Sequence, residues 1–332
     1  MRVLVLGGTV FCSRAIAAAA RRRGHDVVCA ARGASGAPPD GAALVTIDRN
    51  VPGSLEPLRG ERFDAVVDVA TMSLGWVRDA LDVLAPTSGH WTFVSSINAY
   101  SDTTTRGGTA SAPLLEPLLE SPAADSPDTD PNAYGAIKVA SEDAVRATTG
   151  DRALVVRGGL MCGPGDVMDR FGYWADRFAR GGRVVVPDVP GHPAQIVDVR
   201  DLAEWIMRCA EAGTGGTFDG TAPATTLAKV LDEVAGAVGA PDLEVVGLPA
   251  ETLAEAGVGV WAGPRSLPLW LPESHWGIAD RDVTATLAAG FTARSVADTA
   301  RAALEWEKTL GLDRDRRAGL TPEEEASLLA SA

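Results

Sequence analysis

A short apolar run at the start of the chain, followed at once by glycines and an alanine-rich stretch, restricts the fold more than any other feature. Residues 2–6 read Arg-Val-Leu-Val-Leu, a run typical of a strand that is buried on both faces. Gly-Gly-Thr follows at 7–9, and the alanine-rich segment 15–23 stops at Gly24, as a helix with a glycine stop does. A strand, a glycine turn and a helix in this order predict the opening of a parallel α/β fold.

The same alternation of strands and helices continues through the first half of the chain. Further buried strands are predicted at 26–31, 43–47, 63–69, 91–94 and 153–156, with helices at 77–84 and 133–148. This spacing implies right-handed βαβ units, so we predict an α/β fold with a Rossmann-type doubly wound parallel sheet. Beyond it, the pattern predicts helices at 199–212, 227–238, 295–308 and 322–330 and a short strand at 243–246.

Charge and composition exclude several classes of function. Thirty basic and 44 acidic side chains leave a net charge of −14, which repels phosphate backbones and anionic lipid. No apolar run approaches the roughly 20 residues that span a bilayer, and the glycines at 7–8 interrupt any signal-peptide pattern. The four cysteines and four histidines have no metal-ligand spacing. We therefore expect a cytoplasmic, metal-free enzyme that binds neither nucleic acid nor membranes.

The glycine turn is a candidate nucleotide site, because backbone amides there can approach a pyrophosphate and the helix dipole favours an anion. A full Gly-x-x-Gly-x-x-Gly spacing starting at Gly7 would need two more glycines, where this chain has Val10 and Ser13. The second predicted strand ends in Ala31 and Arg32, without the carboxylate that binds the ribose 2′-hydroxyl of NAD. Arg32 can pair with a 2′-phosphate, which favours NADP; the competing interpretation is a solvated arginine.

Two of the rarest residue types in the chain form a pair. The chain has three tyrosines and three lysines, and Tyr134 and Lys138 lie one helical turn apart on one face. An ammonium group lowers the tyrosine pKa from about 10 and makes the hydroxyl a usable acid or base. Ser96 follows the fifth predicted strand, where its hydroxyl can bind a substrate oxygen. The competing interpretations are two unrelated residues on a surface helix and a turn-forming serine.

Together these motifs resemble the extended short-chain dehydrogenase/reductase superfamily, and within it the NAD(P)-dependent epimerase/dehydratase family. Residues 5–11, Val-Leu-Gly-Gly-Thr-Val-Phe, resemble its Gly-Gly-Thr-x-Phe reductase-like subgroup. Segment 91–100 resembles the family's serine segment, which identifies Ser96 as the active serine, and Tyr134 and Lys138 match its Tyr-Lys pair. The resemblance covers nearly the whole chain and is most specific over 1–205.

The resemblance implies a set of site residues. The implied cofactor contacts are Gly7, Gly8, Thr9, Val10, Phe11, Asp48, Arg49, Val69, Ala70 and Lys138, and the end of the second predicted strand adds Arg32. The segment from Arg157 to Asp166 resembles the start of a substrate site. Helical spacing beside that segment adds the weaker substrate candidates Arg170, Tyr173 and Arg177, for which a solvated helix face is the competing interpretation, and Gln195 lies in a later segment that resembles the family.

These residues predict an NADP-dependent oxidoreductase that interconverts a carbonyl and a secondary alcohol on a small-molecule substrate. Tyr134 would protonate the developing alkoxide, Lys138 would lower the tyrosine pKa and bind the nicotinamide ribose, and Ser96 would orient the carbonyl oxygen. Residues 1–165, with 194–220 returning to the sheet, would form the NADP-binding domain. Residues 166–193 and 221–332 would form a smaller C-terminal substrate-binding domain; a homodimer is the expected assembly if the chain oligomerises.

Two other functions remain open at this point. An NAD-dependent sugar-nucleotide epimerase or dehydratase would use the same three residues, but Arg32 and the lack of a basic cluster for a diphosphate argue against it. A non-catalytic cofactor-binding or RNA-binding relative is disfavoured by the complete Ser-Tyr-Lys set and the acidic charge. The segment 101–132, rich in Thr, Ser, Pro, Gly and Asp, is predicted to be a mobile lid at the carboxyl edge of the sheet.

Overall fold

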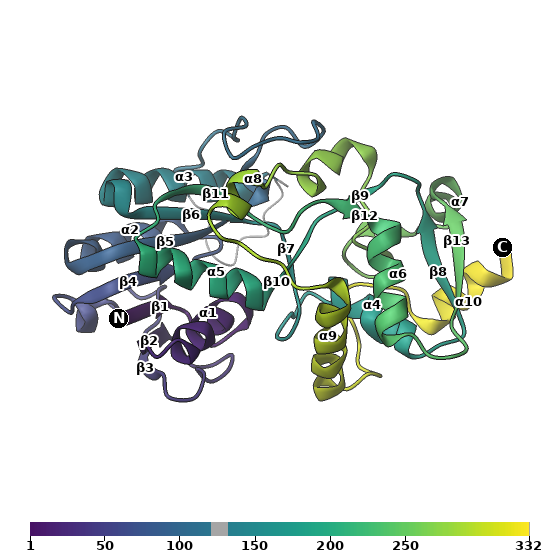
Figure 1. The fold of residues 1–332 in the computed structure, drawn as a ribbon, viewed down its shortest axis with the longest axis horizontal. Coiled ribbons are helices and arrows are strands. Elements are labelled where there is room, and N and C mark those ends of the chain that lie inside the picture. Colours follow the sequence, from purple (N-terminus) through teal and green to yellow (C-terminus); the bar gives the residue numbers. More distant parts are fainter. Residues whose placement is uncertain (121–131, 332) are drawn as a thin grey trace.

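The computed structural model describes residues 1–120 and 132–331, which form two lobes (Figure 1). The larger lobe contains a seven-stranded sheet in the order β11-β6-β5-β4-β1-β2-β3, with every neighbouring pair parallel. Its strands are β1 (Arg2–Leu6), β2 (Asp26–Ala31), β3 (Ala43–Thr46), β4 (Phe63–Asp68), β5 (Ser88–Ser96), β6 (Ala153–Gly158) and β11 (Gly216–Gly220). The strand order reverses between β1 and β4, which confirms the predicted doubly wound sheet and marks the edge where ligands bind in such folds.

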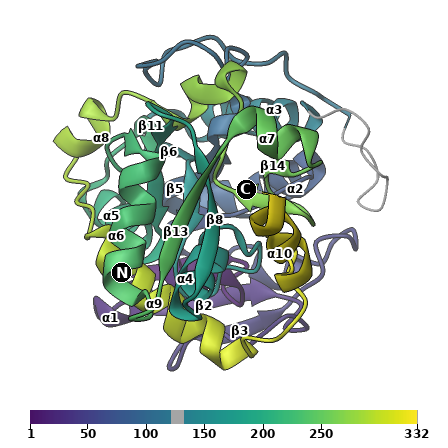
Figure 2. The ribbon, with the colours of Figure 1, turned by 90° about the vertical axis from the view of Figure 1, so that its right-hand side faces the viewer.

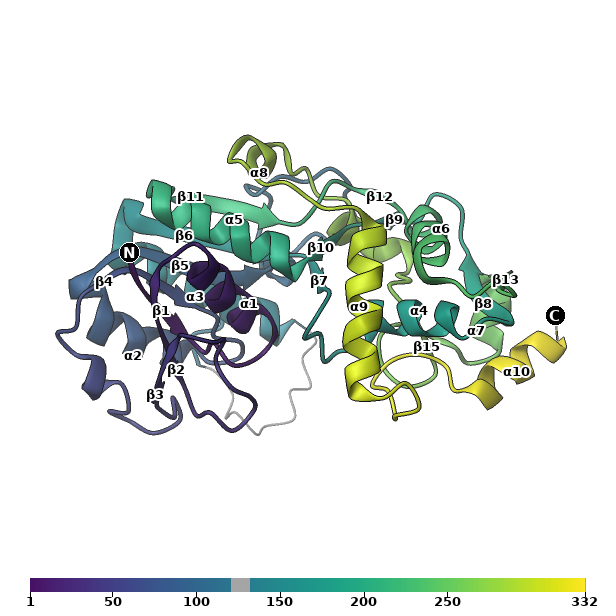
Figure 3. The same cartoon turned by 60° about the horizontal axis from the view of Figure 1, so that its bottom comes forward.

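Helices cover both faces of this sheet, as Figure 3 shows. One face packs against α1 (Phe11–Arg22) and α5 (Val199–Ala212), and the other against α2 (Leu74–Leu84) and α3 (Ala133–Thr149). Along β1, Val3 and Val5 enter the first core whereas Leu4 and Leu6 enter the second, because successive side chains of a strand point to opposite faces. Two covered faces explain why residues 3–6 are continuously apolar and buried, whereas Arg2 lies at the exposed start of the strand.

The smaller lobe is built around three packed helices, α4 (Arg170–Ala179), α6 (Leu227–Val238) and α9 (Val296–Leu310). Beside them, β8 (Arg183–Asp188) and β13 (Glu244–Pro249) run parallel and adjacent, as Figure 2 shows. The remaining helices are α7 (Ala250–Glu255), α8 (Thr284–Ala288) and α10 (Pro322–Ser331). The remaining strand pairs are β7 (Leu160–Cys162) with β10 (Ile196–Asp198), β9 (Pro193–Ala194) with β12 (Thr225–Thr226), and β14 (Gly259–Trp261) with β15 (Ser266–Pro268).

Part of the later chain returns to the larger lobe. Within the stretch assigned from the sequence to a substrate-binding domain, α8 packs on β11, and the Phe291 ring lies 6.0 Å from that of Trp205 on α5. The helix predicted at 322–330 has the reciprocal cap that its sequence indicates. The Glu324 amide donates to Thr321 Oγ1 (3.2 Å), and the Thr321 amide donates to the Glu324 carboxylate (2.9 Å).

A buried chain of polar groups crosses the edge of the sheet. Arg157 on β6 pairs with Glu142 on α3 (2.7 Å) and donates to the Tyr100 hydroxyl (3.0 Å). Tyr100 donates in turn to Asp219 on β11 (2.5 Å), whose second oxygen pairs with Arg281 (3.2 Å). All five side chains are at most 2% exposed. Each charge in this network therefore depends on the next for its compensation.

The buried polar network also binds the backbone of the described part of the segment 101–132. Arg157 donates to the Ala110 carbonyl (2.8 Å), and Arg281 donates to the carbonyl of Thr109. Backbone hydrogen bonds from Leu115 to Ala99 (2.9 Å) and from Leu118 to Ala136 (3.1 Å) extend these anchors along the segment. The predicted lid is thus held at several points up to Leu118, and residues 121–131 lie outside the described residues.

Candidate functional site

The glycine turn after β1 has a shape that side chains would block. Gly7 and Gly8 have φ values of 117° and 93°, which favour glycine. A Cβ atom on Gly8 would lie 2.3 Å from Cys29 Sγ, and one on Gly7 would lie 3.0 Å from Ser13. Val10 is extended (φ −136°), so its position needs no glycine, and Ser13 packs close to Gly7 where the motif has its third glycine. The two departures from the motif are therefore compatible with the turn.

This turn fits a dinucleotide pyrophosphate. The amides at the start of α1, residues 11–13, have no partner within the helix, and the helix dipole adds a positive end there. The loop after β7 passes over the same place, because a Cβ on Gly165 would lie 3.4 Å from Phe11 Cα. Phe11 itself has a φ of 37°, an uncommon value for a side-chain-bearing residue. The start of α1 and the loop at 163–166 thus border one cradle.

The end of β2 carries positive charge without an acidic neighbour. Arg32 is exposed, and the described residues provide no hydrogen bond or ion pair for its guanidinium. Arg14, which the sequence argument missed, lies exposed on the first turn of α1, and its Nε donates to the Ala37 carbonyl in the loop that follows β2 (3.3 Å). Both guanidinium groups are thus associated with the segment after β2, where the ribose of a bound dinucleotide lies in this fold.

Asp48 and Arg49, both expected to contact cofactor, have different surroundings. Asp48 follows β3 and accepts a hydrogen bond from the Asn50 amide (3.0 Å). Arg49 forms a two-pronged pair with the buried Asp68 (2.7 and 3.0 Å), and Asp68 also accepts from the Ala70 amide (2.9 Å). The Arg49 side chain is thus bound within the protein, where it fixes the Val69–Ala70 loop through Asp68.

Three side chains from β5 and α3 meet at the carboxyl edge of the sheet. Ser96 is the last residue of β5, and its hydroxyl shares a hydrogen bond with that of the half-buried Tyr134. The Lys138 ammonium lies 5.7 Å from the centre of the Tyr134 ring. It donates to the Val94 carbonyl (2.8 Å) and to the Ala70 carbonyl, which tie it to the ends of β5 and β4. The structure therefore brings together the three residues that the sequence grouped.

The electrostatics of this group differ from the sequence expectation. Burial raises the pKa of Tyr134, while the hydrogen bond from Ser96 and the positive charge of Arg170 lower it by less. Burial also lowers the pKa of Lys138 to about 8, against the opposing charge of Asp68. The expected lowering of the tyrosine pKa below its ordinary value by Lys138 is thus absent, because burial outweighs the opposing effects of Ser96 and Arg170. Tyr134 remains a protonated hydroxyl, which suits a proton donor.

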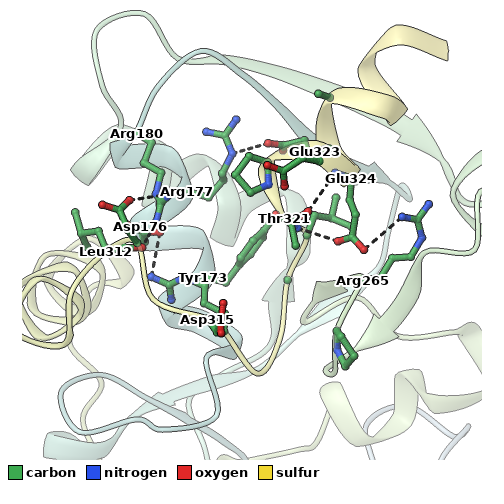
Figure 4. A pocket seen from close by; sticks show the side chains of 18 of the residues that line it. Tyr173, Asp176, Arg177, Arg180, Arg265, Leu312, Asp315, Thr321, Glu323 and Glu324 are labelled. Atoms are coloured by element: carbon green, nitrogen blue, oxygen red, sulfur yellow. Dashed lines mark hydrogen bonds and ion pairs between the residues drawn. The ribbon is translucent and has the colours of Figure 1, made fainter.

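The weaker substrate candidates separate into two places. Arg170 begins α4 and interacts electrostatically with Tyr134. The helix carries Tyr173 and Arg177 further along its axis, about 4.5 and 10.5 Å from Arg170 at 1.5 Å per residue. They line a separate cavity of about 820 Å³ between α4 and the C-terminal segment (Figure 4), where Arg177 pairs with Glu325 (2.6 Å). Tyr173 and Arg177 thus line this cavity, and their role as substrate contacts stays a prediction.

Gln195 holds two segments of the protein together. Its amide nitrogen donates to the carbonyls of Ala222 (3.1 Å) and Arg281 (2.8 Å), and its oxygen accepts from the Arg281 amide (2.7 Å). It is 5% exposed. These bonds use both N–H donors, and they position Arg281 for the buried network described above.

One wall of the site was not visible in the sequence. The ring of Trp261, from the short strand β14, lies 5.0 Å from the Arg170 guanidinium. Trp261 is 91 positions later in the chain, and no spacing rule connects it with α4.

No helix in the described parts of the chain is long and apolar enough to cross a membrane. Over the same residues, no cluster of three or more histidine, cysteine or acidic side chains is arranged to hold a metal.

A doubly wound sheet with a pyrophosphate cradle and a Ser-Tyr-Lys group at one edge defines an NAD(P)-binding protein of the extended short-chain dehydrogenase type. The sequence profile of the NAD dependent epimerase/dehydratase family matches residues 3–219. The chain belongs to this family, as its motifs predicted.

Individual relatives agree with this membership. The chain is 30% identical over 197 residues to a 2′-dehydrokanamycin reductase of Streptomyces kanamyceticus, covering 57% of this chain and 52%, about half, of that relative's length. Its fold is similar to the UDP-N-acetylglucosamine 4-epimerase of Bacillus cereus (TM-score 0.63, 16% identity, 94% of this chain and 99% of the other). It is also similar to the Bordetella bronchiseptica enzyme WbmH in complex with NAD⁺ (TM-score 0.62, 17% identity, 93% and 99%). At these identities the two structures show a shared fold.

Proposed function

We propose that the protein is an NADP-dependent oxidoreductase that interconverts a carbonyl and a secondary alcohol. The observation that carries this proposal is the group of Ser96, Tyr134 and Lys138 beside the Gly7–Gly8 cradle. Membership of a family of NAD(P)-binding enzymes supports it, and so does the partial similarity to a reductase.

Each residue has a role that its surroundings support. Nicotinamide, when bound, supplies or accepts the hydride. Tyr134 holds the proton that neutralises a developing alkoxide, and Ser96 donates to the same oxygen. Lys138 uses two of its three hydrogens on the carbonyls of Ala70 and Val94, so one hydrogen remains for the ribose or the tyrosine oxygen.

The preference for NADP rests on the end of β2. Arg32 is exposed and has no partner among the described residues, and no acidic residue stands at the end of the strand. Arg14 adds a second positive charge near the following loop. A 2′-phosphate would gain a charge-assisted pair there, whereas the 2′-hydroxyl of NAD would find no carboxylate. Asp48 would face the adenine, and Arg49 would act by positioning the Val69–Ala70 loop.

An NAD-dependent sugar-nucleotide epimerase or dehydratase is the second candidate, favoured by the fold neighbours, which include UDP-sugar epimerases. It would use the same three catalytic residues. Arg32 at the end of β2 argues against it, and tightly held NAD⁺ in the purified protein would support it. The non-catalytic relative stays the third candidate. Three further statements stay predictions: the cytoplasmic location, the homodimer and the lack of nucleic-acid binding.

Cofactor titration tests the first part of the proposal. NADPH and NADH are titrated separately into the wild type and Arg32→Ala. An arginine–phosphate pair contributes about 1.5–3 kcal/mol, so wild type should prefer NADPH roughly tenfold to a hundredfold, and the variant should lose most of this preference. Equal affinities in wild type would contradict the NADP assignment.

Single-turnover hydride transfer to a panel of ketones tests the chemistry. Removing the hydroxyl with Tyr134→Phe should slow transfer by roughly 10²- to 10⁴-fold while NADPH affinity barely changes. Tyr173→Phe makes the same chemical change inside the smaller lobe and should leave the rate near that of wild type. A Tyr134→Phe protein with wild-type turnover would rule out the proposed proton donor.

A further inference from the structure

Arg170 is an arginine whose hydrogen-bonding capacity is left open beside the proposed proton donor. It is half-buried, its Nε is fully enclosed without a partner, and the described residues offer its guanidinium no hydrogen bond or ion pair. Its charge interacts with Tyr134. Burying unpaired donors is unfavourable, so such a group points to a partner that binds there.

The surroundings hold the arginine in place, and its charge interacts with Asp166 without a direct hydrogen bond or ion pair. Its guanidinium lies over the ring of Trp261 (5.0 Å), a residue with a φ of 66°. The preceding residue, Asp169, has a φ of 60°, and its carboxylate is bound by Arg314 and by the Arg317 amide (2.8 Å). Two uncommon backbone conformations thus flank the group, a pattern that is concentrated at functional sites.

Asp166, the acidic group that interacts electrostatically with Arg170, does not pair directly with its guanidinium. Asp166 accepts from the Met168 amide through one oxygen (2.8 Å), and its other oxygen is buried without a partner. Asp166 interacts with the charge of Arg170 but makes no direct ion pair with its guanidinium. Burial raises the pKa of Asp166 to about 6, so the carboxyl is partly protonated near neutral pH. The place therefore combines one full positive charge with a weakly acidic neighbour.

The wall next to Trp261 is mostly apolar. A small cavity of about 10 Å³ touches Trp261, Ile97, Leu269 and Leu271, and Ile97 directly follows Ser96 in the chain. Trp261 joins this apolar wall to Arg170, whose guanidinium lies over its ring. An arginine in such a place discriminates strongly, because an uncharged group would leave it desolvated and unpaired.

We propose that Arg170, held on the face of Trp261, binds a carboxylate of the substrate, so that the reacting molecule is an oxo acid or the corresponding hydroxy acid. This inference rests on the proposed oxidoreductase function for the identity of the reacting group. The guanidinium fork matches the two oxygens of a carboxylate. A dianionic phosphate would face a single arginine with Asp166 beside it, so a monoanion is the better match.

Paired ligands test this binding directly. The probes are 3-hydroxybutyrate, 2-hydroxyisovalerate and mandelate, each compared with its primary amide by calorimetric titration with and without NADP⁺. Wild type should bind at least one acid roughly tenfold to a hundredfold more tightly than its amide. Arg170→Met should remove the preference, and Arg170→Lys should keep part of it, because lysine retains the charge but loses the fork. Arg301→Met, at an exposed position on α9, is the control.

The outcomes separate this inference from the proposed function. Loss of NADP⁺ affinity in Arg170→Met would assign the arginine to the cofactor and overturn the inference. Tighter binding of inorganic phosphate than of acetate, dependent on Arg170, would also overturn it, as would equal affinities for every acid and amide. If acids bind through Arg170 but neither an oxo acid nor any ketone of the panel is reduced, the proposed function fails and only the carboxylate site stands. If ketones are reduced without any Arg170-dependent preference for acids, the inference alone fails.

Discussion

At the residue scale, Lys138 has the most unusual environment of the three proposed catalytic groups. Its side chain is 2% exposed, and carbonyls from the ends of β4 and β5 accept two of its hydrogens. Burial disfavours the ammonium form and lowers its pKa to about 8. The lysine therefore loses its charge within a pH range that is accessible to experiment.

This lowered pKa predicts a pH-dependent contribution to stability. Below about pH 8 the lysine is protonated in both folded and unfolded chains; between about pH 8 and 10 mainly the unfolded chain keeps the proton. Unfolding then requires proton uptake, so rising pH favours the folded state. The free energy of unfolding of wild type relative to Lys138→Met should increase from about pH 7 to about pH 10, measured by urea denaturation.

Lys229→Met is the matched control, because Lys229 is exposed on α6 and should give no such trend. A difference between wild type and Lys138→Met that stays constant over the pH range would mean that Lys138 remains charged in the folded protein.

Sequence alone grouped Ser96, Tyr134 and Lys138 because two of them share a helix face and the third ends a predicted strand. It could not find Trp261 beside Arg170, since this contact joins distant segments through tertiary packing. It also treated Arg49 as a ligand contact, because a sequence does not reveal that a buried carboxylate, Asp68, binds the guanidinium.

At the element scale, the glycine turn between β1 and α1 fixes how the helix follows the strand. Gly8 combines a positive φ with a close approach to Cys29, so two separate costs oppose any side chain there. The sequence predicted the strand and the glycine turn correctly. It started the helix at residue 15 instead of Phe11, because Val10 and Phe11 lack the usual helix-start signals. It returned residues 194–220 to the sheet but predicted no strand at β11, since Gly-Thr-Phe-Asp-Gly has a single strongly apolar residue.

Gly8→Ala should destabilise the protein by more than a simple glycine replacement. A left-handed backbone costs an alanine about 1–2 kcal/mol, and forcing a methyl group against Cys29 adds about 1–3 kcal/mol. Gly24→Ala isolates the first cost, because Gly24 has a φ of 82° but no atom within 4 Å of an added Cβ. Urea denaturation should rank wild type above Gly24→Ala and Gly24→Ala above Gly8→Ala. Equal stability of the two variants would contradict the packing argument.

At the scale of the whole molecule, the buried network from Glu142 to Arg281 joins helix α3, strands β6 and β11 and the segment after β5. Arg281 belongs to the later chain, yet it compensates Asp219 at the edge of the sheet. The sequence placed Arg281 in the predicted substrate-binding domain, within 221–332. It could not predict the ion pair between Arg281 and Asp219, because the pairing of charges that are distant in the sequence depends on how the two halves pack.

Asp219→Asn should leave Arg281 buried without its ionic partner, at a cost of about 3–5 kcal/mol. Arg281→Met should cost a similar amount, and the double variant less than the sum, by about 1–3 kcal/mol. Denaturant unfolding measures the three free energies. Limited proteolysis should show earlier cleavage between residues 101 and 118 in either single variant. Strict additivity would mean that the two side chains are energetically independent.

The binding of the Asp169 carboxylate by Arg314 and the Arg317 amide has a consequence for the order in which the chain folds during synthesis. Synthesis delivers every strand of the large sheet by Gly220, whereas Arg314 and Arg317, which hold Asp169, emerge much later. A nascent chain thus has all the strands that frame the nucleotide cradle before it has the contacts that fix Arg170. We therefore expect the nucleotide cradle to be completed before the segment between α9 and α10 fixes the residue that precedes Arg170.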